Sequence, residues 1–135
     1  MKFKYLVTLS LLLVLQAFAL LCGQTGYSVG ITVNEASDTK IRLAYHLGNQ
    51  QYIKDSLSTD KAGKGRFTGS DKLSPGVYMI VFPGNIFFEF LAGEDQYFDI
   101  SCSINDPAGT LVFRGSEENE RFLEYQKRWK SLQEE

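Results

Sequence analysis

The chain has 135 residues, of which 44% are hydrophobic, and its 14 Lys and Arg residues against 16 Asp and Glu residues give a formal net charge of −2. This length suits one domain with a core of modest size. The slight acidity, without a long run of basic residues, argues against a nucleic-acid-binding protein and against attraction to an anionic membrane surface.

The N-terminus predicts a secretory signal peptide over residues 1–23. Lys2 and Lys4 form a basic start, residues 6–15 form an apolar stretch, and small residues follow it. This is the layout of an export signal. Cleavage after Ala19 and cleavage after Gly23 both fit the pattern of small residues. We therefore expect an exported protein of the periplasm or cell envelope.

Two alternatives for this segment are less favoured. Cys22 is a candidate for the acylated cysteine of a lipoprotein, but Leu21 is bulky for the position before such a cysteine. An uncleaved anchor needs about 20 apolar residues. The stretch from residue 5 to residue 21 is shorter and contains Gln16. Cleavage and release therefore remain the expectation.

The region from residue 24 to residue 115 predicts an antiparallel β-sandwich or open barrel of about eight short strands. Alternation of apolar and polar residues, with turn residues between the segments, is typical of such folds. The expected strands cover residues 27–34, 40–47, 51–58, 66–70, 77–82, 86–91, 96–104 and 110–114.

The most apolar part of this region is a predicted hairpin, with Pro83, Gly84 and Asn85 as its turn. Successive side chains of a strand point to opposite faces of the sheet, and in these two strands both sets are apolar. We therefore expect the hairpin to lie in the middle of a sheet, with packing on both faces. Glu89 is its one charge, and we expect it at the surface with a lysine partner.

No pattern of residues in the chain indicates an active site, a cofactor site or a metal site. His46 is the single histidine, on the polar side of a predicted strand, so it lacks the further ligands of a zinc site. Cys102 shares a predicted inward face with Phe98, Ile100 and Ile104, which predicts a buried thiol and not a redox-active one. We expect no catalytic activity and no cofactor.

A C-terminal helix or connector is predicted over residues 116–135. Ser116 is the candidate N-cap, and Glu117 and Glu118 suit the positive end of the helix dipole. An apolar stripe follows at helical spacing, made of Phe122, Tyr125, Trp129 and Leu132. The sequence after the stripe contains neither Gly nor Pro as a stop signal, which suggests the start of a connector.

The stripe and the hairpin together define a candidate interface of Phe87, Leu91, Tyr125, Trp129 and Leu132. We expect the first helical turns, through about Tyr125, to pack on a spare apolar face of the hairpin formed by Tyr78, Ile80, Phe87 and Leu91. The later turns, with Trp129 and Leu132, are expected to contact a following domain or a partner protein.

Several short segments together resemble a known family. They are Asp38–Thr39, Leu43–Tyr45, Tyr52–Ser56, Gly65–Phe67, Leu73–Tyr78, Phe88–Phe90 and Phe113–Asn119. In this order and spacing, from about residue 26 to residue 129, they resemble the β-rich N-terminal domain, itself of unknown function, that precedes the thioredoxin-like domain of secreted bacterial thiol–disulfide oxidoreductases of the TlpA and AhpC/TSA type. In that family the thioredoxin-like domain carries the chemistry in a CxxC motif. This chain has no CxxC motif, so the resemblance implies fold, location and a thioredoxin-like partner, but no activity.

The expected function is therefore that of a non-catalytic accessory or interaction domain in a secreted thioredoxin-like system of the bacterial envelope. The alternative is a free-standing periplasmic or surface domain that binds a peptide or a glycan. Exposed aromatic residues on a sheet face would favour that alternative, and Tyr52, Tyr78 and Phe87 are the candidates.

Overall fold

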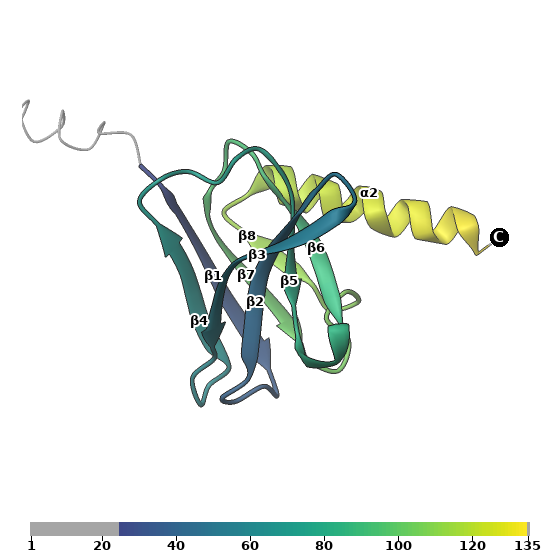
Figure 1. The fold of residues 1–135 in the computed structure, drawn as a ribbon. Helices are drawn as coiled ribbons and strands as arrows, with labels where there is room; N and C mark the ends of the chain where they lie inside the picture. The colour runs from purple at the N-terminus through teal and green to yellow at the C-terminus, as the bar shows by residue number, and fades with distance from the viewer. Residues whose placement is uncertain (1–24, 135) are drawn as a thin grey trace, which may run out of the picture.

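The computed structural model describes residues 25–134 (Figure 1). The expected signal peptide and Cys22 lie outside these residues. The elements in chain order are β1 (Tyr27–Asn34), β2 (Lys40–Leu47), β3 (Gln50–Ser58), β4 (Lys64–Gly69), β5 (Gly76–Val81), η1 (Pro83–Asn85), β6 (Phe87–Ala92), β7 (Tyr97–Ser103), β8 (Val112–Arg114) and α2 (Glu117–Gln133).

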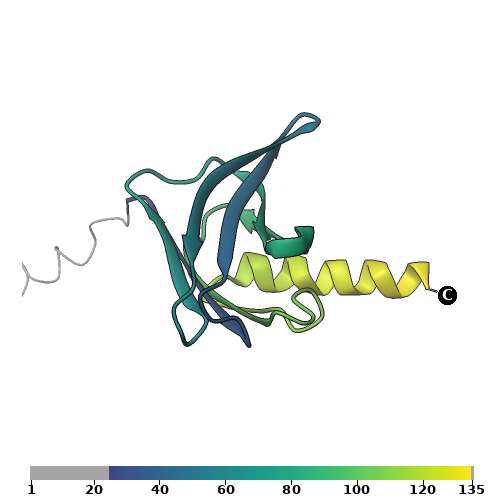
Figure 2. The ribbon, with the colours of Figure 1, turned by 60° about the horizontal axis from the view of Figure 1, so that its bottom comes forward.

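The strands form two four-stranded sheets that face each other and do not close into a barrel. Sheet A has the strand order β4-β1-β7-β8, and sheet B has the order β3-β2-β5-β6. The predicted mainly β sandwich with a C-terminal helix is thus confirmed (Figure 2). One detail differs from the antiparallel expectation, since β1 and β7 pair in parallel. Parallel neighbours need a long connection, and here the chain crosses through sheet B between them.

The core lies between the two sheets and comes from the alternation along each strand. Val29, Ile31 and Val33 of β1 are buried, and Ile100 and Cys102 face inward from β7 beside them. An aromatic chain with ring centroids 5.7–6.2 Å apart crosses from one sheet to the other. Its members are Tyr52, Tyr45, Tyr78, Phe90, Phe98 and Phe113. Stacked and edge-to-face aromatic pairs add specific geometry to the apolar burial.

The predicted hairpin forms as expected around Pro83, Gly84 and Asn85, with positive φ at Gly84 (80°) and Asn85 (59°). Its position in the sheet differs from the expectation. β5 lies inside sheet B, but β6 is an edge strand. Glu89 is half-buried on β6 and forms no ion pair among residues 25–134, so the expected lysine partner is not found.

The helix α2 covers the open side of the sandwich between β6 and β8. Ser116 is its N-cap, as predicted, and its Oγ accepts a hydrogen bond from the backbone N–H of Asn119 at 3.3 Å. The side chain of Asn119 is fully buried and bonds both backbone groups of Leu91. The first turn of α2 is therefore held against the edge of β6, and the rest of the helix extends past the sandwich (Figure 1).

Candidate interaction surface

The outer face of sheet B carries apolar side chains that no other element among residues 25–134 covers. Phe87 is 47% exposed and Val77 is 38% exposed, and Leu91 pairs directly with Val77. Met79 and Ala44 form a second cross-strand pair on this face and are buried beneath their neighbours. This face is thus apolar at its centre and partly open to solvent.

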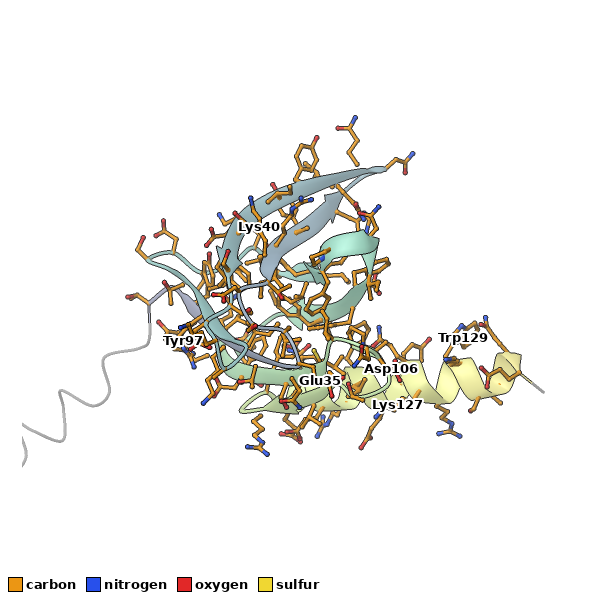
Figure 3. The ribbon with its side chains drawn as sticks, turned by 90° about the horizontal axis from the view of Figure 1, so that it is seen from below. Glu35, Lys40, Tyr97, Asp106, Lys127 and Trp129 are labelled. Carbon is orange, nitrogen blue, oxygen red and sulfur yellow. The ribbon has the colours of Figure 1, made fainter. Side chains whose placement is uncertain are left out.

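The stripe on α2 starts beside this sheet face and continues away from it. Phe122 is half-buried and lines a shallow hollow together with Leu91. Beyond it Tyr125 is 62% exposed, Trp129 is 55% exposed and Leu132 is 61% exposed. Trp129 lies on the part of α2 that extends beyond the strands (Figure 3). Sheet face and stripe therefore meet at this hollow, whose lining also includes the charged residues Glu94, Asp95, Glu117, Glu118 and Arg121.

Two parts of the predicted interface need correction. Tyr78 and Ile80 point into the core, whereas Phe87 and Leu91 lie on the outer face, because Tyr78 pairs with Phe90 and Ile80 with Phe88. Directly paired residues share a face, and the turn places the odd-numbered residues of both strands outside. Tyr78 is thus not a surface aromatic residue.

The helix also leaves the sandwich earlier than predicted. Leu123 packs against the core, but Tyr125 does not. The helix contacts the sandwich through the side that carries Asn119 and Leu123, and Tyr125 lies about 160° around the helix from Leu123. Of the predicted interface, Phe87 and Leu91 share the sheet face, and Tyr125, Trp129 and Leu132 share the exposed stripe.

A groove of about 710 Å³ lies on the other flank of α2, between the helix, the edge of β6 and the loop 106–111. Its apolar lining comes from Phe88, Leu111 and Leu123. Lys127 of the helix and Asp106 of the loop line the same groove and are labelled near each other in Figure 3. Sequence reasoning missed this groove because its walls come from three segments that are distant along the chain.

A polar groove of about 550 Å³ lies on the outer face of sheet A. Arg66 and Asp99 form an ion pair at 2.6 Å across Gly30, where any Cβ atom would collide with both side chains. Arg114 pairs in register with Asp99, and Lys64 also lines the groove. Among residues 25–134 neither Lys64 nor Arg114 forms a salt bridge.

The cysteine and histidine side chains do not form a reactive or metal-binding group among residues 25–134. Cys102 is buried, as predicted, and burial raises the pKa of its thiol from 9.0 to about 11. His46 is exposed at the end of β2. Within the part of the chain that the structure describes, no three His, Cys, Asp or Glu side chains come together as a metal site.

Asn119 is a structural residue whose contact with β6 sequence reasoning did not predict. Its amide fills a gap at the edge of β6, with Oδ1 accepting from Leu91 N at 2.7 Å and Nδ2 donating to Leu91 O at 2.9 Å. The spacing Ser116-x-x-Asn119 resembles a capping box and was the available signal. The contact with β6 could not be predicted from the local sequence, because Leu91 lies 28 residues earlier in the chain.

No protein-family model and no curated protein matches this chain. Among residues 25–134, no helix has the length and apolar character needed to cross a membrane. The class that fold and surface define is a small two-sheet β-sandwich whose edge is covered by a projecting amphipathic helix.

Proposed function

We propose that this chain is a non-catalytic interaction domain of a secreted thioredoxin-like system in the bacterial envelope. One observation carries the proposal: Tyr125, Trp129 and Leu132 lie exposed along one side of a helix that extends past its own domain. The resemblance in the sequence supplies the partner, a thioredoxin-like domain.

The energetics of the stripe support a docking role. Large apolar side chains that are exposed together commonly mark an interface, and aromatic residues dominate the binding energy of protein interfaces. The stripe and the sheet face meet at the hollow of Phe122 and Leu91, which is rimmed by charged side chains. A partner domain placed in this angle would cover both surfaces at once and would fix the direction of the helix.

The lack of chemistry in the described part of the chain fits an accessory role. Cys102 is the one cysteine of residues 25–134, and its thiol is buried. Thiol–disulfide exchange needs an accessible thiolate of lowered pKa, whereas burial raises the pKa of Cys102. The redox step is therefore assigned to the partner.

Site-specific photocrosslinking in exporting cells tests the proposal. A benzophenone amino acid at position 129 is expected to crosslink to an envelope protein that mass spectrometry identifies as carrying a CxxC thioredoxin-like domain. The same group at position 124, an exposed position about 140° around α2 from position 129, is the matched control. Failure to crosslink any thioredoxin-like protein from position 129, or equal yield from both positions, would contradict the proposal.

The groove on sheet A favours the alternative of a free-standing binding domain. Its lining holds Lys64, Arg66 and Arg114 against Asp60 and Asp99, with the hydroxyl groups of Thr32 and Ser101, and this slight excess of positive charge suits an anionic, hydroxyl-rich ligand such as an acidic glycan. Arg114→Ala is expected to weaken retention of the protein on an alginate column, with Arg128→Ala as the control. Identical retention of all three proteins would remove this alternative.

A further inference from the structure

β6 is an edge strand, and the contacts of Asn119 reveal which of its backbone groups point outward. Asn119 bonds both the N–H and the C=O of Leu91, so these groups point away from β5. In an antiparallel ladder this orientation recurs at every second residue. The N–H and C=O groups of Glu89 and Phe87 therefore also point outward along the same edge.

These outward groups lack hydrogen-bond partners among residues 25–134. Asn119 satisfies Leu91, but no side chain or backbone group of the described chain does the same for Glu89 or Phe87. An edge strand with free groups is a template for a further strand, and proteins commonly cover such edges. Here Asn119 covers the edge only at Leu91, and the edge is uncovered at Glu89 and Phe87.

The free part of the edge opens into the groove beside α2. Phe87, Phe88 and Glu89 form one wall, and α2 forms another from Leu123 to Glu134. This stretch of helix is about 16 Å long, which is the length of about five residues in an extended chain. The groove volume of about 710 Å³ lies within the range of ligand sites, roughly 300–1,000 Å³.

We propose that this groove binds an extended peptide, which adds to sheet B as a further strand antiparallel to β6. Strand addition beside a helix lets backbone hydrogen bonds supply affinity, while alternate side chains supply selectivity. The occupant is a single extended chain because the helix wall stands opposite the edge and leaves no path for a second sheet.

The lining defines the chemistry of the peptide. Opposite Glu89 it carries a basic residue, and opposite Phe87 a β-branched or aromatic residue, as in favourable cross-strand pairs. The residue between them points inward and is apolar, because Phe88, Leu111 and Leu123 line that side. Lys127, which forms no ion pair among residues 25–134, suits a C-terminal carboxylate, whereas Lys130 already pairs with Glu134 at 4.0 Å.

The first test uses a defined probe, acetyl-Thr-Lys-Leu-Val-Asp with a free C-terminus, and the ¹⁵N-labelled mature protein. We expect saturable NMR shifts centred on the amides of Phe87 and Glu89, with a Kd of about 1 mM or tighter. N-methylation of the probe at Val removes a hydrogen bond to β6 and is expected to weaken binding about tenfold. N-methylation at Leu is the matched control, because that N–H points away from β6 and affinity should change little.

Protein variants test the same groove from the other side. Glu89→Pro removes one outward N–H without touching the pairing with β5, a place where an edge strand accepts proline. We expect loss of binding with Glu89→Pro, and a weakening of no more than about fivefold with Glu89→Gln, which loses the charge opposite the lysine of the probe but keeps the outward N–H. If Glu89→Pro does not fold, Lys127→Glu replaces it, with Arg128→Glu as the control, because Arg128 lies about 100° around α2 from Lys127 and does not line the groove.

Absence of saturable shifts at about 2 mM probe, or equal weakening by both N-methyl groups, would overturn the peptide site. The result is independent of partner docking, since Trp129 lies about 160° around the helix from Lys127. Failure of the photocrosslink at position 129 with intact peptide binding would refute the docking role alone, and the reverse result would refute the groove alone.

Discussion

At the scale of single residues, Asn119 has the largest structural effect for its size. It is a polar side chain with no exposed surface, and its amide bonds the two backbone groups of Leu91 and the hydroxyl of Ser116. A buried amide is tolerated when its hydrogen bonds are satisfied. Asn119 therefore acts as a short substitute for a neighbouring strand at the edge of β6.

Asn119→Leu keeps much of the side-chain volume but leaves the N–H and C=O of Leu91 without partners. Unsatisfied buried groups cost about 1–3 kcal/mol each, so we expect a loss of about 3 kcal/mol in the free energy of unfolding. Urea denaturation measures it. Glu120→Ala, one residue further on the exposed side of α2, is the control and should stay within about 0.5 kcal/mol. A loss as small as the control's would mean that the bonds to Leu91 contribute little.

Cys102 predicts a pH dependence whose sign follows from its burial. The folded-state pKa of its thiol is about 11, against an ordinary value of 9.0, so the unfolded chain loses this proton at lower pH. The stability that Cys102 contributes is therefore complete below pH 9 and is lost as the pH rises towards 11.

Cys102→Ala removes that titration at a packing cost of about 1 kcal/mol near neutral pH. Burial also raises the pKa values of Tyr27 and Tyr78, but both proteins share these groups. The difference in unfolding free energy between the parent and the variant should therefore shrink between pH 9 and pH 11. A constant difference, or rapid labelling of the native thiol by iodoacetamide at pH 8, would contradict the buried position.

At the scale of elements, α2 has two parts that differ in their environment. Its first turns carry the N-cap Ser116, the buried Asn119 and the half-buried Leu123, whereas its last turns carry exposed side chains on every side. A helix without packing or caps is marginal in water. The end that is proposed to dock a partner is thus the end that the domain itself supports least.

Amide hydrogen exchange on the isolated mature domain checks this division. We expect strong protection at the amides near Leu123, because they open only when α2 leaves the sandwich, and fast exchange beyond Trp129. Binding of the proposed partner should slow the exchange of those last turns. Uniform protection through Leu132 in the isolated domain would show that the helix needs no partner.

At the scale of the whole molecule, two sheets share one core and leave distinct surfaces outside it. Sheet A carries a polar groove, sheet B carries an apolar face, and α2 separates that face from the groove at the edge of β6. Alternation along the strands separates the core from these outer surfaces, since each strand points one set of side chains into the core and the other set towards solvent.

The N-terminal sequence predicts that the whole molecule reaches the envelope as a cleaved protein. A basic start, an apolar stretch and small residues are the layout of an export signal, with cleavage expected after Ala19 or Gly23. Intact-mass measurement of the protein from the envelope fraction should show a chain that starts after Ala19 or Gly23. A chain that still contains residues 1–15 would contradict this, and an acylated Cys22 would favour the lipoprotein alternative.

The sequence by itself determined the properties that depend on near neighbours in the chain. Strand alternation predicted the sandwich and the burial of Cys102, and helical spacing after Ser116 predicted the helix with its N-cap. The turn at Pro83–Asn85 was also predictable from the sequence, since Gly and Asn tolerate the positive φ that it needs.

The tertiary structure alone decided how these elements meet. Which of two apolar faces of the hairpin lies inside depends on pairing across the turn, so Tyr78 and Phe87 could not be assigned to opposite faces from composition. Three features join residues that are distant in sequence: the edge position of β6, the hydrogen bonds of Asn119 to Leu91 and the groove beside Lys127. Long-range pairing leaves no periodic signal in the chain, because the residues that meet are separated by segments of unrelated length.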